Sequence, residues 1–214
     1  MTNGYTSWNE LNLIFKLEHL KEIEMLLENT NSLWEKRYQE LLAQADSIED
    51  EDIKTEFYDF YFEELQLMSE TLPRINRYGL FSNLFSFLEY NILVQCKEAI
   101  RTLSIDNEIK GHYFSDYIIF LRENVSLQLI SVDIEQEVEF MRIIRNRILH
   151  SNGKVDVTSE KKQHVEAKHY VESNPLLRFS DDKHILLSDE YIRKCLQLVE
   201  GIITEIHSAI YSKE

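Results

Sequence analysis

The chain has 214 residues and a formal net charge of −15, and it holds only two prolines and five glycines. So few chain-breaking residues disfavour an all-β fold, which needs many turns, and the sequence predicts an all-α protein with a single domain, residues 1–214. No apolar run approaches the ~18 residues of a membrane-spanning helix, and the first residues do not resemble a secretion signal, so we expect a cytoplasmic protein without membrane contact. The acidic charge argues against broad, non-specific binding of nucleic acids.

The first third of the chain is predicted to form two helices. Residues 8–45 carry apolar side chains at helical spacing and form one long helix or two in line. The acids of residues 47–52 suit the start of a second helix, which runs to about Leu72 and is ended by Pro73. Its apolar side chains cover most of the circumference, which indicates burial on two sides or a subunit interface, with ordinary core as the alternative. These side chains are Phe57, Tyr58, Phe60, Tyr61, Phe62, Leu65 and Met68.

Residues 74–104 are predicted to form a strongly apolar helix with one central acid, Glu89. A carboxylate in apolar surroundings is costly unless it is paired. We therefore expect a cationic partner from another helix, and Arg145 is the candidate. In the alternative, Glu89 points to solvent from the polar edge of its helix.

The rest of the chain is predicted to hold three helices and one irregular segment. A short helix spans Tyr113–Glu123, and a longer one, the motif helix, begins at an Asp133 cap with Gln136 reaching back, and stops at Gly153. Residues 154–174 are charged without a sustained period and are expected to form a loop. Residues 184–187 form a short strand or extended turn before a last helix, which is capped by residues 188–190 and ends near residue 210.

The end of the motif helix carries the most distinctive residues of the chain. Between Phe140 and Lys154 there are four basic residues and no acid, in a chain that is otherwise acidic. At about 100° per residue, this helix has an apolar seam facing the core and a polar stripe beside it. The seam consists of Met141, Ile144 and Ile148, and the stripe consists of Arg142, Asn146 and His150.

Arg145 and His150 have complementary chemistry for cutting RNA. Arginine offers a permanent charge and a planar fork of donors for a phosphate, and histidine exchanges a proton near neutral pH. Arg145 lies on the shoulder between seam and stripe, about 140° around an ideal helix from His150, so one copy cannot present both side chains to one atom. Either the last turn unwinds near Ser151, or two copies of the chain face each other across a shared cleft.

The residues Arg145, Asn146 and His150 resemble the R-x(4–6)-H signature of HEPN domains, the higher-eukaryote and prokaryote nucleotide-binding family, in its variant with Asn after Arg. The resemblance covers residues 74–213, and it implies an antiparallel helical bundle to which residues 1–72 add an N-terminal helical extension. It also implies a metal-independent endoribonuclease that works as a symmetric homodimer without a cofactor. Because the attacking group is the ribose 2′-OH, DNA should resist cleavage.

The same resemblance implies roles for individual side chains. His150 would move the proton of the 2′-OH or of the leaving oxygen, Arg145 would hold the phosphate, and Asn146 would orient His150 or the phosphate. The family contains toxins and antiviral-defence effectors, so an antitoxin or a defence-system protein is an expected partner beside RNA. One departure is Asn152, because many family toxins have Tyr at that position. The residues expected to contact RNA around the catalytic trio are Arg142, Arg147, Asn152 and Lys154.

Two other functions compete with the ribonuclease. The chain could be a catalytically inactive HEPN-like scaffold that dimerises and binds a protein partner, with Arg145 merely paired to Glu89. A metalloenzyme has little support, because no HExxH, paired ExxH or cysteine cluster is present. Cys96 and Cys195 lie in apolar helical patterns and are expected to be buried thiols in a reducing compartment.

Overall fold

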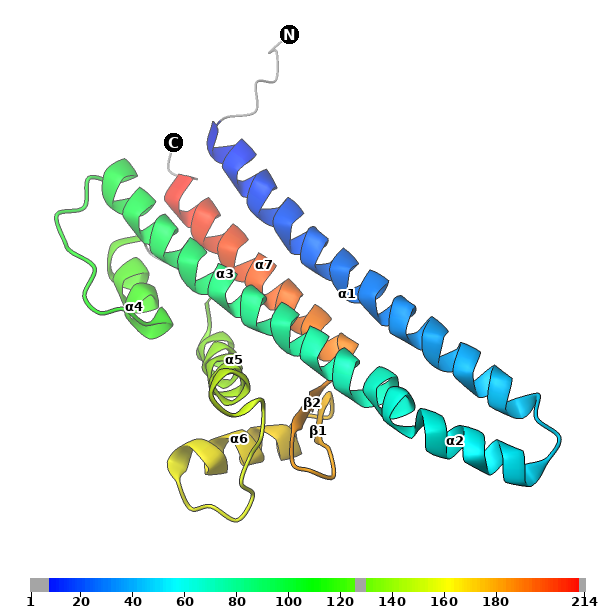
Figure 1. Ribbon diagram of the computed structural model, residues 1–214. Coiled ribbons are helices and arrows are strands. Elements are labelled where there is room, and N and C mark those ends of the chain that lie inside the picture. Colours follow the sequence, from blue (N-terminus) through cyan, green and yellow to red (C-terminus); the bar gives the residue numbers. More distant parts are fainter. Residues whose placement is uncertain (1–7, 126–129, 212–214) are drawn as a thin grey trace, which may run out of the picture.

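The computed structural model describes residues 8–125 and 130–211 and confirms the all-α fold (Figure 1). Three long helices, α1, α3 and α7, lie side by side. The elements α4, α5, α6 and the two strands gather at one flank, whereas α2 lies beside the end of α1. The described elements are α1 (Trp8–Asp46), α2 (Glu51–Gln66), a π turn (Leu67–Thr71), α3 (Leu72–Thr102), α4 (Phe114–Val125), α5 (Val132–Ser151), α6 (Lys162–Ser173), β1 (Leu177–Phe179), β2 (Ile185–Leu187) and α7 (Asp189–Tyr211).

The core lies between α1, α3 and α7. Helix α3 supplies its centre with Phe81, Phe85 and Leu88, which are completely buried, and Leu27 of α1 belongs to the same cluster. The apolar seam of the motif helix also reaches this core. The Gln95 side chain in α3 donates a 2.9 Å hydrogen bond from its amide nitrogen to a main-chain carbonyl of α7, while its buried Oε1 has no partner among the described residues.

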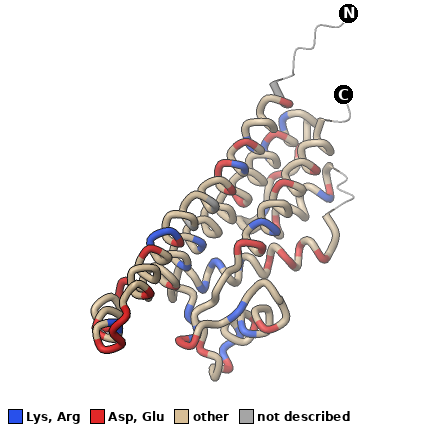
Figure 2. The backbone as a smooth tube through the Cα atoms, turned by 90° about the vertical axis from the view of Figure 1, so that its right-hand side faces the viewer, with Lys and Arg blue, Asp and Glu red and all other residues tan. Residues whose placement is uncertain are grey.

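Residues 1–72 were expected to form an N-terminal helical extension, of which residues 1–7 lie outside the described residues. The described part is divided between the core and a projecting arm. The first half of α1 packs on α3 and α7, whereas its last turns pair with α2 and extend beyond the other elements (Figures 1 and 2). No side chain of α2 is buried, so the predicted burial on two sides is wrong. Pro73 does not end the helix, because the chain continues through the π turn, with Pro73 in the first turn of α3. A widened turn is a common way for a helix to absorb such a distortion.

Residues 154–174 are not the predicted loop, because α6 occupies half of them. Helix α6 buries Ala167, Tyr170 and Val171, which share one face at the spacing i, i+3 and i+4. Behind it, β1 and β2 pair antiparallel with Leu177 opposite Leu187. The sequence predicted an extended segment near β2 but not the pairing strand β1.

The two cysteines are buried, as predicted, and burial raises the pKa of each thiol to about 12. Within the described ranges, no helix has the length and apolar character needed to cross a membrane.

Candidate functional site

The site is built on α5, whose faces confirm the predicted seam and stripe. Met141 and Ile144 are completely buried, Arg142 and Asn146 are partly exposed, and His150 is exposed. The cap differs from the prediction: Ser131 rather than Asp133 precedes the helix, and its hydroxyl accepts a hydrogen bond from the Ile134 backbone. Asp133 falls instead in the first turn, where its charge suits the helix dipole.

The last turn of α5 stays helical through Ser151, so the predicted unwinding of this turn is wrong. The chain reverses at two residues with positive φ, Asn152 at 50° and Gly153 at 75°. The Gly153 amide donates to the Arg147 carbonyl over 2.9 Å, which closes the helix end. At Gly153 a Cβ atom would collide with the Tyr78 hydroxyl, which donates to the carbonyl of Ile185. Only glycine fits this close approach.

The Arg145 guanidinium is held by its immediate surroundings. Its Nη1 donates to Asn146 Oδ1 over 3.2 Å, and its Cζ lies 5.9 Å from the centre of the Phe85 ring. Its Nε is buried and has no hydrogen-bond partner among the described residues. The stem therefore lies on the apolar core of the bundle, and one donor remains unused. Asn146, expected to orient His150 or the phosphate, accepts the hydrogen bond that holds Arg145 in this structure.

Glu89 does not form the predicted ion pair with Arg145, since the structure has no direct contact within 4.0 Å between these two described side chains. The carboxyl is half-buried in α3. Burial raises its pKa, while the charges of Arg145 and then Arg142 act in the opposite direction. The two residues are thus coupled through the electric field rather than through a hydrogen bond.

The four basic residues near the end of the helix have different environments. Arg147, expected to line the RNA groove, is only 8% exposed and faces α6. Its guanidinium donates to Gln163 over 3.2 Å and lies 3.4 Å from His164 Nε2, so it joins α5 to α6. Arg142 donates two hydrogen bonds to Glu139, at 2.7 and 2.5 Å. With Arg145, which donates to Asn146, three of the four cations therefore already have hydrogen-bond partners within the chain.

The loop after α5 is fixed to the strand β2. The carbonyl of Asn152 accepts a 2.9 Å hydrogen bond from His184 Nδ1, and Lys154 pairs with His184 in an antiparallel bridge. The side chains of Asn152 and Lys154 are exposed. Both residues lie at the His150 end of α5, so the structure brings three of the predicted site residues to one end of one helix.

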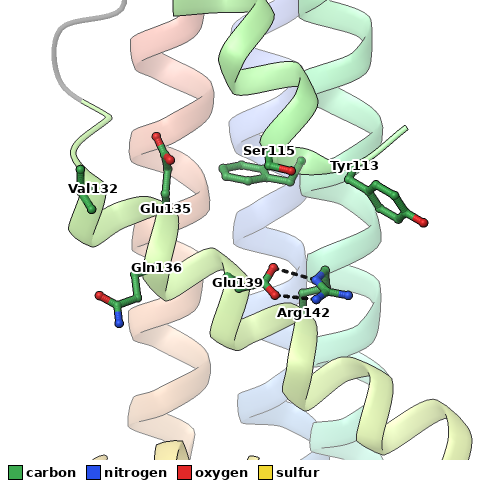
Figure 3. A pocket seen from close by; sticks show the side chains of 8 residues that line it. Tyr113, Ser115, Val132, Glu135, Gln136, Glu139 and Arg142 are labelled. Carbon is green, nitrogen blue, oxygen red and sulfur yellow. Dashed lines mark hydrogen bonds and ion pairs between the residues drawn. The ribbon is translucent and has the colours of Figure 1, made fainter. Parts of the chain in front are cut away.

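A groove of about 670 Å³ lies two turns before His150, between the start of α4 and the first half of α5 (Figure 3). The close-up shows the Glu139–Arg142 pair on α5 and the Tyr113 ring beside the start of α4. This groove was not predicted from the sequence, because its two walls belong to different helices whose relative position depends on tertiary packing. Its lining residues are Tyr113, Phe114, Ser115, Val132, Glu135, Gln136, Glu139 and Arg142.

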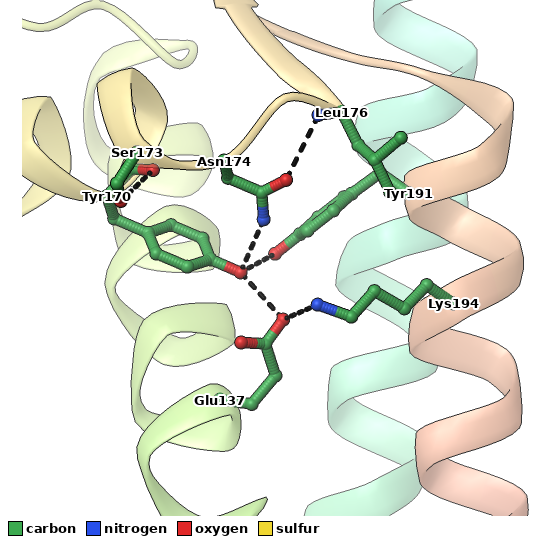
Figure 4. Close-up of polar contacts among 7 residues, drawn as sticks. All are labelled: Glu137, Tyr170, Ser173, Asn174, Leu176, Tyr191 and Lys194. Carbon is green, nitrogen blue, oxygen red and sulfur yellow. Dashed lines mark hydrogen bonds and ion pairs between the residues drawn. The ribbon is translucent and has the colours of Figure 1, made fainter. Parts of the chain in front are cut away.

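A polar network around the Tyr170 hydroxyl positions α5 against α6 and α7 (Figure 4). This hydroxyl donates to Glu137 over 2.8 Å, accepts from the Asn174 amide over 3.1 Å, and lies 3.2 Å from the Tyr191 hydroxyl. Lys194 donates to the same Glu137 oxygen over 2.7 Å. Desolvation raises the pKa of Tyr170, so the phenol stays protonated at neutral pH. This network was not predicted, since its members lie on three separate segments.

Comparisons with known proteins give no assignment: no family model, no curated protein and no solved structure matches this chain. Within residues 8–125 and 130–211, no group of three or more His, Cys, Asp or Glu side chains is placed to hold a metal ion.

Proposed function

We propose that this chain is a metal-independent endoribonuclease of the HEPN type, which cuts RNA as a symmetric homodimer and serves as a toxin or antiviral-defence effector. The observation that carries the proposal is the pair Arg145 and His150 on the last two turns of α5, where the arginine is partly exposed and the histidine is exposed. A cation and a proton-exchanging ring are the two groups that transfer of a phosphate to a neighbouring 2′-OH requires.

The proposed reaction uses side-chain chemistry alone. One imidazole takes the proton of the ribose 2′-OH, the 2′ oxygen attacks the adjacent phosphorus, and the bond to the 5′ oxygen breaks. The same imidazole, now protonated, gives that proton to the leaving oxygen. Arg145 neutralises the charge that develops on the phosphate oxygens. The products are a 2′,3′-cyclic phosphate and a 5′-hydroxyl.

A second copy of the chain completes the site in this proposal. Because α5 is regular through Ser151, Arg145 and His150 stay about 140° apart around its axis. Two antiparallel copies of α5 can place an arginine and a histidine at the same phosphate, since each copy brings its Arg145 toward the His150 of the other. Leu149 supports such a contact, because it lies between these two residues on the helical wheel and is 52% exposed.

The test is cleavage of matched RNA and DNA oligonucleotides in the presence of a chelator. The Arg145→Ala and His150→Ala variants are compared with Arg178→Ala and His112→Ala, which remove the same residue types at exposed positions elsewhere. We expect cleavage of RNA only, with cyclic phosphate ends. Loss of His150 should lower the rate about 10²- to 10⁴-fold, and Arg145→Ala should have a comparable effect. The two control variants should retain the activity.

The same experiment separates the enzyme from the inactive scaffold. Equal RNA degradation by all five proteins would identify a contaminating nuclease, and no cleavage by any of them would favour a HEPN-like scaffold. Cleavage that requires a divalent ion would contradict the metal-independent chemistry proposed for His150.

A further inference from the structure

The arm formed by the end of α1 and by α2 carries a second apolar row that nothing in the structure covers. Helix α2 pairs with α1 through the Glu64–Arg37 ion pair, and the partly buried rings of Phe57 and Tyr61 lie 4.5 Å apart on α2. Beside them, three further apolar side chains recur every seven residues and are exposed by 55%, 79% and 41%. We call them the arm ridge: Ile53, Phe60 and Leu67.

The spacing of the arm ridge is that of a helix-packing seam. Fourteen residues separate its first and last members, which is about 21 Å along the helix. A seven-residue repeat keeps apolar side chains in line with a neighbouring helix over such a length. On the arm this row is additional to the side of α2 that lies against α1. The segment from α2 to Leu67 therefore presents an apolar row that has no neighbouring helix among the described residues.

The charges beside the arm ridge decide which partner fits. Residues 51–70 hold seven acids and one lysine, and Figure 2 shows red predominating at the far end of the arm. Glu56 and Glu63 fall within the row of the ridge and form no ion pair in the part of the chain that the structure describes. By contrast, Glu64 and Lys54 pair with α1, through Arg37 and Asp46. The free carboxylates therefore belong to the open side.

We propose that the arm ridge binds a basic amphipathic helix of another protein. Apolar side chains of that helix would cover Phe60 and its two neighbours in the row, and its lysines or arginines would meet Glu56 and Glu63. A second copy of this chain fits poorly, because a twofold contact would set the same carboxylates against each other. This binding surface is separate from the proposed ribonuclease site on α5.

The test uses a synthetic 18-residue peptide of leucine and lysine with leucine at heptad positions, and a scrambled peptide of the same composition. Binding to the full chain is followed by fluorescence anisotropy at several salt concentrations. The variants are Phe60→Ser and the double reversal Glu56→Lys with Glu63→Lys. The matched control is Phe62→Ser, which removes a phenylalanine that is 63% exposed on the other side of α2.

We expect the patterned peptide to bind, with a Kd about tenfold higher for Phe60→Ser and for the charge reversal, and changed less than twofold by Phe62→Ser. The reversal should also weaken the dependence of binding on salt. Absence of binding, equal binding of the scrambled peptide, or equal loss in both phenylalanine variants would overturn the proposal. A fall in the molecular mass of the peptide-free protein on Phe60→Ser would assign the ridge to a second copy and also overturn it.

Discussion

At the scale of single residues, the effect of the Arg145 charge on Glu89 can be tested in the protein alone, without RNA. Burial raises the pKa of this carboxyl and the Arg145 charge opposes that rise, so the ionised form is less favourable in the folded chain than in the unfolded one. Stability contributed by the protonated carboxyl is present below its ordinary pKa and declines as the pH rises through the raised value. At pH 7, Glu89→Gln should therefore unfold at a higher urea concentration than the parent chain, and the gap should close near pH 4.

The control for this prediction is the same substitution in an Arg145→Ala background. Without the arginine charge the carboxylate is less compensated, so the stabilisation by Glu89→Gln at pH 7 should increase. An unchanged difference between the two backgrounds would mean that Arg145 does not act on Glu89. A destabilising effect of Glu89→Gln at pH 7 would contradict the direction of the pKa shift.

At the scale of secondary structure, the Tyr170 network holds α6 and α7 against the motif helix. Tyr170→Phe keeps the ring that stacks on Phe140 at 4.1 Å but removes the hydroxyl. The buried Tyr191 hydroxyl and the Asn174 amide then each lose a partner. We expect a loss of about 1–3 kcal/mol in the free energy of unfolding, measured by urea denaturation. The control Tyr113→Phe, at an exposed ring, should change the free energy of unfolding by less than about 0.5 kcal/mol. An equally small loss for Tyr170→Phe would refute the structural role of the network.

Most of the helices could be predicted from the sequence. The long helices were predictable because each carries several turns of apolar spacing, and the seam of α5 was predicted residue by residue. Helix α6 was missed because its buried face holds only three side chains, dominated by Tyr170, within a strongly charged segment. The cap of α5 was misplaced because Ser131 and Asp133 are both good caps, and the choice depends on the tertiary position of the preceding chain.

The candidate site was predictable in its composition and less so in its contacts. Arg145, Asn146 and His150 were singled out from their spacing. The exposure of Asn146 and His150 agrees with the predicted stripe, and Arg145 is partly exposed, as expected of its place on the shoulder. The burial of Arg147 could not be predicted, because it depends on α6, which the sequence did not reveal. Likewise, the pairing of Arg142 with Glu139 is one of several i, i+3 and i+4 contacts open to a surface arginine.

At the scale of the whole molecule, the proposed twofold site makes a prediction about mixed dimers. A dimer with Arg145→Ala in one subunit and His150→Ala in the other has one composite site that lacks both groups and one that retains both. Differently tagged subunits are co-expressed, and the heterodimer is isolated by two affinity steps. Its RNA cleavage rate should be about half of the wild-type rate, although each mutant homodimer is inactive. An inactive heterodimer, with its dimeric mass confirmed by sedimentation, would show that the two groups do not act across the twofold axis. Full activity in a wild-type protein that sediments as a monomer would refute the shared cleft altogether.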